Sequence, residues 1–362
     1  MRHHFEELVS SLFPGGRITA VTPLGSSAPA GASVEKTAGY GAPVRISIAR
    51  EDGGEVELVF RTANANDYGH DRRSDRAGAQ LLAYDTFGAI PRHVRPIDVG
   101  AISKDGRLVS LHESGELYLV TTYAPGKLYA DDLREVAKRA VTPADLTRTT
   151  TLARYLVGLH ADRRVRPAGY RRAVRDLIGH GEGIFGVIDG YPDAVPGAPA
   201  SRLQGIEKRT LEWRWKMRGR EARFTRTHGD FHPFNIVFQD DGELALLDTS
   251  RGSEGEAADD VCCLAVNYVF FALSGAPSPK LAWERGLRPL WTTFWDTYLE
   301  ESADRDLLAV AAPFLAWRLL VLASPVWYGG LSESDRDKLL GFAERALTAE
   351  RFDPAWADAL FT

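Results

Sequence analysis

The sequence predicts an α+β protein of two domains, the first built on an antiparallel sheet and the second mostly helical. Runs of alternating apolar and polar residues, separated by turn signals, occupy the first third of the 362 residues; this pattern is typical of antiparallel strands. From about residue 130 onward, apolar residues recur at helical spacing. The change falls near Tyr123-Ala124-Pro125-Gly126. We therefore expect one domain over residues 1–123 and a second over 124–362.

The first domain is expected to contain one helix at its start and one between its strands. An amphipathic pattern predicts a helix over residues 2–13, and Glu51-Asp52-Gly53-Gly54 is a turn signal between two alternating runs. A helix over 71–87 would place Ala77, Leu81, Leu82 and Tyr84 inward. The expected strands are 17–24, 44–49 and 56–61, followed by a further hairpin over 99–110 and 116–123.

The second domain begins with a clear helix signal. In Thr142-Pro143-Ala144-Asp145, Thr suits the cap, Pro the first turn and Asp the positive end of a helix that runs to His160. Residues 167–200 are rich in Gly and Pro and are expected to be partly irregular. A helix over 202–219 precedes the key motif, and helices follow it. The apolar stretches near 261–273 and 307–323 are interrupted by polar residues and Pro and predict buried helices; the interruptions are Asn267, Pro313 and Arg318.

Composition excludes several classes of protein. A net charge of −5 argues against a nucleic-acid binder, which would show a basic balance or stripe. The two cysteines, Cys262 and Cys263, are adjacent and cannot form a disulfide framework, which predicts a reducing, cytoplasmic compartment. Because no apolar run approaches 18 residues, we expect no membrane span. The N-terminus lacks the apolar core of a signal peptide.

The segment Thr227-His228-Gly229-Asp230-Phe231-His232-Pro233-Phe234-Asn235, followed by Leu247-Asp248, carries the chemistry. Asp230 and Asn235 lie five residues apart, and a predicted hairpin over 236–247 returns the chain so that Asp248 lies beside Asn235. This is the layout of a magnesium-dependent phosphoryl-transfer site. Asp230 would orient the attacking hydroxyl, while Asn235 and Asp248 would offer oxygen ligands to Mg²⁺.

Two histidines flank Asp230 in this motif. His228 is expected to hold the backbone of the loop by hydrogen bonds rather than to transfer protons. For His232, two positions are open: packing on the loop, or a place near the acceptor hydroxyl.

The pattern H-G-D-x-H-x-x-N with the downstream Leu247-Asp248 resembles the aminoglycoside phosphotransferase family, which is similar to choline, homoserine and methylthioribose kinases. The resemblance covers most of the chain. It implies a protein-kinase-like fold, ATP and Mg²⁺ as cofactors, and a small-molecule hydroxyl acceptor. The donor could equally be GTP, and the oligomeric state is open.

The resemblance also implies nucleotide-binding residues in the first domain. The loop that begins Gly25-Ser26-Ser27 sits where the family covers the ATP phosphates, and Thr122 and Tyr123 end the strand that would contact adenine. Arg61 stands where the family carries Lys. Its acidic partner would be Asp75, with Asp71 as the alternative. In the second domain, Asp260 matches an acid that buttresses the catalytic loop, although it could also cap the next helix.

The sequence gives the weakest indication for the residues that bind the acceptor. Glu254, Glu256 and Asp259 are candidates for binding amines, but the same acids would suit a solvated loop before a helix. Trp327 and Tyr328 are the aromatic pair expected to be exposed and able to stack on a sugar. Core packing is expected for Trp291, Trp295 and Trp317.

Two rival functions come from other classes. His228, Asp230 and His232 could instead be ligands of a metallohydrolase, although such sites need further ligands. The replacement of Lys by Arg61 also suggests a nucleotide-binding module without turnover. The match to G-x-G-x-x-G at residues 181–186 lacks a preceding strand, so we interpret it as a loop.

Overall fold

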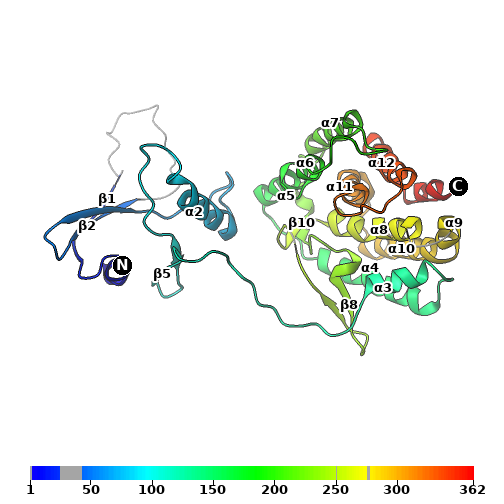
Figure 1. The fold of residues 1–362 in the computed structure, drawn as a ribbon. Coiled ribbons are helices and arrows are strands. Elements are labelled where there is room, and N and C mark those ends of the chain that lie inside the picture. The colour runs from blue at the N-terminus through cyan, green and yellow to red at the C-terminus, as the bar shows by residue number, and fades with distance from the viewer. Residues whose placement is uncertain (1, 25–42, 250, 275–277) are drawn as a thin grey trace. The chain divides into compact units, whose positions relative to one another are not determined.

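The computed structural model describes residues 2–24, 43–249, 251–274 and 278–362. The chain forms two compact units, Met1–Thr121 and Thr122–Thr362. Antiparallel sheets dominate the first unit and helices the second (Figure 1). The predicted α+β class is therefore confirmed.

The N-terminal unit is a three-stranded antiparallel sheet, in the order β1-β2-β3, covered by a helix (Figure 1). Its small core joins Phe5 and Val9 of the first helix to Ile46 and Ile48 of the middle strand. The Phe5 and Phe60 rings meet edge to face with centroids 5.0 Å apart. The elements of this unit are α1 (Arg2–Leu12), β1 (Arg17–Pro23), β2 (Val44–Ala49), β3 (Glu55–Phe60), α2 (Arg73–Phe87), β4 (Gly100–Ile102) and β5 (Leu108–Ser110).

The prediction that one face of α2 is buried is wrong. Among the described residues of the helix none is buried, and Leu82 is 64% exposed. The small core of this unit is formed by α1 and the sheet, and it includes no described residue of α2.

The strand predicted over 116–123 is also wrong. Residues 99–110, predicted as one arm of a hairpin with 116–123, instead form the hairpin β4–β5 by themselves, with Ala101 opposite Val109, and no described strand pairs with residues 116–123. Leu119 is 85% exposed. An alternating pattern specifies a strand only where a neighbour supplies backbone hydrogen bonds. Thr122 and Tyr123 therefore lie in an irregular, exposed segment.

The C-terminal unit packs its helices around α8 (Figure 1). Helix α8 is long and apolar enough to cross a membrane, but 94% of it is buried inside the unit, as in the core helix of a folded domain. Cys262 and Cys263 are free and buried on it, as predicted. The helices of the unit are α3 (Tyr129–Val136), α4 (Pro143–His160), α5 (Pro167–Gly179), α6 (Ile184–Asp189), α7 (Ala200–Lys216), α8 (Ala257–Ser274), α9 (Pro279–Ala282), α10 (Arg288–Ser302), α11 (Ala312–Ala323) and α12 (Glu333–Thr348).

Short strands and turns of other helix types connect these helices. One small sheet has the order β6-β8-β9, and a second pairs β7 with β10. They consist of β6 (Lys127–Leu128), β7 (Phe224–Arg226), β8 (Ile236–Phe238), β9 (Leu244–Leu246) and β10 (Glu254–Glu256). The remaining elements are η1 (Glu221–Arg223), η2 (Pro233–Asn235), η3 (Trp283–Leu287), η4 (Leu307–Ala309) and η5 (Pro354–Phe361).

Residues 167–200 are partly irregular, as predicted, since 180–183 and 190–199 lie outside the helices α5 and α6. Pro167 stands in the first turn of α5, where its missing N–H costs nothing. Tyr170, Val174 and Leu177 recur at helical spacing, and all three are buried. The Gly and Pro content that suggested irregular chain therefore marks helix ends, while the apolar period decides the interior.

The start of α4 is confirmed and gives a pH prediction. Thr142 and Asp145 form a reciprocal cap, and Arg139 donates to Asp145 at 2.7 Å. Burial alone would raise the pKa of Asp145, but hydrogen bonds from Arg139 and Thr142 outweigh it and lower the pKa to about 2. A lowered folded-state pKa stabilises the protein above the unfolded-state value and loses that effect as pH falls toward 2.

We therefore expect Asp145→Asn to lower the free energy of unfolding by about 2 kcal/mol at pH 7. The difference from the wild type should shrink by about half at pH 3. Urea unfolding at both pH values measures it. Asp131→Asn, which removes an exposed ion pair with Arg134, is the control and should change stability by less than about 1 kcal/mol. A pH-independent loss in Asp145→Asn would contradict the proposed charge effect.

Candidate active site

The segment Thr227–Asn235, here called the catalytic loop, connects β7 to β8. Strand β7 pairs with β10, and β8 pairs with β9, so both ends of the loop are fixed. Gly229 has φ = 82°, and a Cβ there would lie 3.1 Å from the Gly252 carbonyl oxygen. The left-handed backbone and the close approach both require glycine. At this turn, just before Asp230, the chain leaves the direction of β7.

Asp260 lies beneath the catalytic loop, in the first turn of α8. Its carboxylate accepts the backbone N–H groups of His228 at 2.7 Å and of Gly229 at 2.8 Å. His160 contacts the same carboxylate through Nε2 at 3.1 Å, while its Nδ1 lies 2.7 Å from the Tyr298 hydroxyl. Two roles were open for Asp260, support of the catalytic loop and capping of α8. These contacts are the ones that support of the loop requires.

The charge of Asp260 is stabilised despite complete burial. Burial alone would raise its pKa, but hydrogen bonds from His160 and from the two loop amides outweigh it and lower the pKa. His160 was not singled out from the sequence. A histidine in the last turn of a helix carries no signal of its own, and its partner lies 100 residues away.

Asp230 presents two differently bonded oxygens. Its Oδ1 accepts a hydrogen bond from Arg318 Nη1 at 2.6 Å. Its Oδ2 lies 3.3 Å from His232 Nε2 and 3.2 Å from Asn235 Nδ2. Burial alone would raise the pKa of Asp230, but His232 and Arg318 outweigh it and hold the pKa well below its usual range. The side chain is therefore a carboxylate, and it is 23% exposed.

Asn235 lies beside Asp230 and Asp248, as the spacing predicted. Its amide NH₂ donates to the backbone carbonyls of Asp230 at 3.1 Å and Asp248 at 3.2 Å. The hairpin brings Asp248 back, since Leu247 N–H donates to the Asn235 carbonyl at 2.9 Å. The NH₂ group of Asn235 is bonded to the loop. The amide oxygen of Asn235, to which no described residue donates, is therefore available to a ligand.

The donor set at Asn235 and Asp248 fits Mg²⁺. The Asp248 side chain is exposed, while its backbone carbonyl accepts from the Asn235 NH₂ group. One neutral and one charged oxygen are the ligand types that Mg²⁺ prefers, and it usually keeps waters and phosphate oxygens as its other ligands.

The two histidines of the catalytic loop are held by its backbone. His228 Nδ1 accepts the Asp230 N–H at 3.3 Å, and its ring packs on Phe231. His232 Nδ1 accepts the Phe234 N–H at 3.2 Å. Because Nδ1 of His232 is the acceptor, Nε2 carries the proton and donates to Asp230. His228 supports the backbone, while His232 also contacts the candidate catalytic carboxylate.

Comparison with known proteins now decides the family. A model of the phosphotransferase enzyme family matches residues 48–294, more than half of the chain. The chain belongs to this family. The resemblance stated from the H-G-D-x-H-x-x-N motif is thereby confirmed. The protein is a phosphotransferase that acts on a hydroxyl group of a small molecule.

Solved structures similar to this phosphotransferase share little sequence with it. A glucosamine kinase is 15% identical over 94% of this chain and 96% of its own, with a TM-score of 0.43. The choline kinase LicA from Streptococcus pneumoniae is 12% identical over 96% and 99%, with a TM-score of 0.34. An aminoglycoside-3'-phosphotransferase of type VIII is 17% identical over 88% and 99%, with a TM-score of 0.34. No curated protein matches the chain significantly.

Arg318 contacts the candidate catalytic carboxylate, although no motif in the sequence of this phosphotransferase points to it. It lies on α11, 88 residues after Asp230, and donates to Asp230, to the Gly229 carbonyl at 3.0 Å and to Asp259 at 3.2 Å. The signal for it was a charged side chain inside the apolar stretch 312–323, which a core helix does not carry without a partner. Its partner could not be named from the sequence.

The acids proposed to bind amines are instead paired with arginines. Glu254 faces Arg166 at 3.4 Å. Glu256 is buried, with Arg223 at 2.7 Å and the Tyr170 hydroxyl at 2.9 Å. Asp259 contacts two arginines, Arg251 and Arg318. Glu256 cannot reach an acceptor, because the pairing of β10 with β7 turns it into the core.

Trp327 and Tyr328 differ in how far their side chains are exposed. Trp327 is 55% exposed, as predicted. Tyr328 is half-buried and packs edge to face on Phe270, with centroids 4.7 Å apart. Core packing holds for the three tryptophans of the helices, Trp291, Trp295 and Trp317.

The candidates in the N-terminal unit have local contacts of their own. The Arg61 guanidinium lies over the Phe87 ring, 5.5 Å from its centroid. Asp75 accepts the Arg72 N–H at 2.8 Å at the start of α2. The pairing of Arg61 with Asp75 or Asp71 stays a prediction. Gly25, Ser26 and Ser27 lie outside the described residues.

The metallohydrolase alternative is not supported. Across residues 2–24, 43–249, 251–274 and 278–362, no group of three His, Cys, Asp or Glu side chains is arranged to hold a metal ion. The ring of His228 is used on the loop backbone and on Phe231, and His232 is bonded to Phe234 and Asp230.

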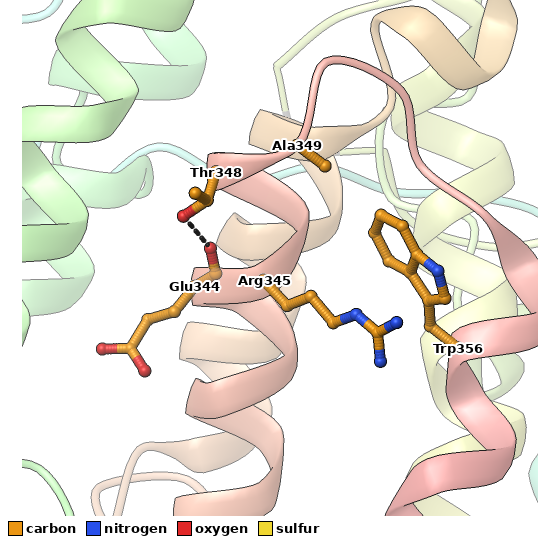
Figure 2. Close-up of a pocket in the computed structure, with 5 residues that line it drawn as sticks. All are labelled: Glu344, Arg345, Thr348, Ala349 and Trp356. Carbon is orange, nitrogen blue, oxygen red and sulfur yellow. Dashed lines mark hydrogen bonds between the residues drawn. The ribbon is translucent and has the colours of Figure 1, made fainter.

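A surface hollow of about 400 Å³ lies elsewhere, between α12 and η5. Figure 2 shows the Arg345 side chain directed at Trp356, whose ring centroid is 4.4 Å from the guanidinium carbon. No residue of the catalytic loop lines this hollow. It is therefore separate from the candidate active site.

Proposed function

We propose that this phosphotransferase is an ATP- and Mg²⁺-dependent kinase that transfers the γ-phosphoryl group to a hydroxyl of an aminoglycoside, sugar or amino alcohol. The observation that carries this proposal is the orientation of Asn235. Its NH₂ group donates to the backbone carbonyls of Asp230 and Asp248 and to the Asp230 carboxylate, so the three residues meet at this amide. Phosphoryl transfer requires a carboxylate at the attacking hydroxyl and metal ligands close to it, and these three residues are of the types required.

Asp230 is the proposed catalytic residue. Its ionised carboxylate accepts a hydrogen bond from the acceptor hydroxyl and aims the hydroxyl oxygen at the γ-phosphorus. As the new P–O bond forms and the bond to the leaving ADP oxygen breaks, the hydroxyl proton passes to Asp230. The strongly lowered pKa of Asp230 suits an orienting group that takes the proton late.

Asn235 and Asp248 are the proposed ligands of Mg²⁺. The bound ion would neutralise the charge on the ATP phosphates. In the N-terminal unit we propose that Arg61 contacts the phosphates, supported by Asp75, and that the Gly25-Ser26-Ser27 loop covers them. The segment with Thr122 and Tyr123 would contact adenine.

A cytoplasmic location is part of the proposal. It is supported by the free, buried thiols of Cys262 and Cys263 and by the burial of the most apolar helix. Nothing in the paired acids of β10 and α8 favours a polycationic acceptor over a neutral one.

An acceptor panel tests the proposed function. Purified protein would be given Mg²⁺-ATP with aminoglycosides, amino sugars, simple sugars or amino alcohols, and ADP release would be followed. We expect at least one class to raise the rate of release above that with water alone. Repeating the assay with GTP identifies the donor. Bound ATP with no turnover on any acceptor would instead favour the non-catalytic module.

Asp248→Ala gives a prediction for the metal site. We expect the affinity for Mg²⁺-ATP to fall by about tenfold or more, because one of two protein ligands is lost. Affinity for ATP without Mg²⁺ should change little. Calorimetric titration with and without Mg²⁺ measures both. Asp240→Ala, in the exposed turn of the same hairpin, is the control, and equal Mg²⁺-ATP affinity in the two variants would refute the role of Asp248.

A further inference from the structure

We propose that Arg318 is a positioning residue for Asp230, which holds the catalytic carboxylate in one orientation toward the acceptor hydroxyl. This inference rests on the proposed function. It assigns a role to a residue that lies outside the motif and outside the 48–294 stretch matched by the family model.

The Arg318 guanidinium reaches three groups at once. Nη1 donates to Asp230 Oδ1 at 2.6 Å, while Nη2 donates to the Gly229 carbonyl at 3.0 Å and to Asp259 Oδ1 at 3.2 Å. Arg318 thus bonds both to the Asp230 side chain and to the backbone immediately before it. A planar fork can hold this geometry, whereas an ammonium group on a flexible stem cannot. These contacts set the rotamer of Asp230 relative to its own backbone.

Arg318 is itself held in place. Its side chain is 8% exposed, and its guanidinium carbon lies 3.6 Å from the centroid of the neighbouring Trp317 ring. Asp259 pairs with Arg318 on one side and with Arg251 on the other. Asp230, Arg318, Asp259 and Arg251 therefore form one chain of alternating charge with no net charge, which lowers the cost of burying each member.

A second tether fixes the helix that carries Arg318. Trp317 Nε1 donates to the Glu182 carbonyl at 2.9 Å, in the turn before α6. The Arg251 guanidinium carbon lies 3.9 Å from the Trp317 ring centroid, and its Nη2 reaches the Gly229 carbonyl at 3.4 Å. Loop, helix and charge chain are thus packed as one body, and Arg318 has no alternative position to occupy without breaking several of these contacts.

The two oxygens of Asp230 differ because of this arrangement. Oδ1 receives the short, charge-assisted bond from Arg318. Oδ2 receives two longer contacts, from His232 at 3.3 Å and from the Asn235 NH₂ group at 3.2 Å. Arg318 therefore supplies the shortest of the three contacts that hold this carboxylate, and it is the one that comes from outside the catalytic loop.

A purely structural role is the alternative, and Arg336 provides its matched control. Arg336 on α12 is equally buried and donates to the backbone carbonyls of Ala323, Pro196 and Leu331. It touches no residue of the catalytic loop. If burial of a guanidinium were all that mattered, Arg318→Met and Arg336→Met would act alike.

The experiment compares Arg318→Met, Arg318→Lys and Arg336→Met. The assay is ADP release from Mg²⁺-ATP with water as acceptor, at a temperature where circular dichroism shows each variant folded. We expect kcat of Arg318→Met to fall by about 10- to 100-fold, because a small misplacement of a reacting group costs this much. KM for ATP should stay within about threefold, since the nucleotide ligands are untouched.

The Lys variant and the control sharpen the result. Arg318→Lys keeps the charge and should recover part of the kcat that Arg318→Met loses. Arg336→Met should lower thermal stability while kcat of the folded protein stays near that of the wild type. Wild-type kcat in Arg318→Met, or an equal loss in Arg336→Met, would overturn the inference.

A double-mutant cycle separates this inference from the proposed function. If Arg318 acts through Asp230, Arg318→Met should have little further effect once Asp230 is Asn. Undiminished turnover in Asp230→Asn would remove the proposed function itself. Loss of turnover in Asp230→Asn together with full kcat in Arg318→Met would remove only the role of Arg318.

Discussion

Asp230→Asn is expected to lower turnover by about 10²- to 10⁴-fold while the affinity for Mg²⁺-ATP stays near that of the wild type. Asn has the same shape but cannot take the hydroxyl proton. Its amide oxygen should turn toward Arg318, which donates to this position at 2.6 Å in the wild type. The NH₂ group would then face two donors, His232 and Asn235, instead of accepting from them.

The measurement is acceptor-dependent ADP release, with nucleotide affinity from calorimetric titration. Asp240→Asn, in an exposed turn outside the catalytic loop, is the control and should keep wild-type turnover. If Asp230→Asn also kept near-normal turnover, Asp230 could not be the residue that orients the hydroxyl. A loss of nucleotide affinity as large as the loss of turnover would point to a disturbed loop.

Asp260→Ala is expected to cost stability as well as activity. Asp260 is fully buried and accepts from His160 and from the N–H groups of His228 and Gly229. Its removal leaves three buried donors without an acceptor, and breaking a buried charged network of this kind typically costs about 3–5 kcal/mol. Because two of those donors are loop amides, kcat should fall even in the folded protein.

Urea unfolding monitored by circular dichroism measures the stability change, and ADP release measures kcat. Asp260→Asn keeps the volume and one acceptor and should lose less stability than Asp260→Ala. The exposed Asp296→Ala on α10 is the control, with an expected change within about 0.5 kcal/mol. Equal stability of Asp260→Ala and the wild type would show that the loop is anchored elsewhere.

The geometry within the motif could be predicted because it is local. Asn235 follows Asp230 by five positions, and the hairpin with its Asp240-Asp241-Gly242 turn returns the chain to Asp248, as the register Ile236 opposite Leu246 requires. Gly242 takes φ = 85°, which the turn needs. Short-range spacing and turn chemistry were sufficient for these three side chains.

The supports of the motif could not be predicted, because their partners are distant in the sequence. His160 meets Asp260 across 100 residues, and Arg318 meets Asp230 across 88. Neither pair has a spacing that periodicity can reveal. The pairing of Glu256 with Arg223 lies across 33 residues, so the sequence left two roles open for this acid-rich segment, amine binding and a solvated loop before a helix.

The errors in secondary structure have a related cause. Residues 116–123 alternate like a strand, but a strand depends on a partner that the local pattern does not specify. Residues 167–200 are partly irregular as predicted, and the helical part could be located from the spacing of Tyr170, Val174 and Leu177, which are buried in α5. Gly and Pro indicate where the helices end, whereas the spacing of the apolar residues indicates where their interiors lie.

The position of Arg318 on α11 has a consequence for minimal forms of this enzyme. A protein shortened after residue 294 would retain the whole stretch matched by the family model and every residue of the H-G-D-x-H-x-x-N motif. It would nevertheless lose the guanidinium that Asp230 pairs with, and Asp259 would lose one of its two cations. Two carboxylates would then be left close together with too little positive charge. The contacts of Asp230 thus extend into a part of the chain that the recognisable motif does not reach.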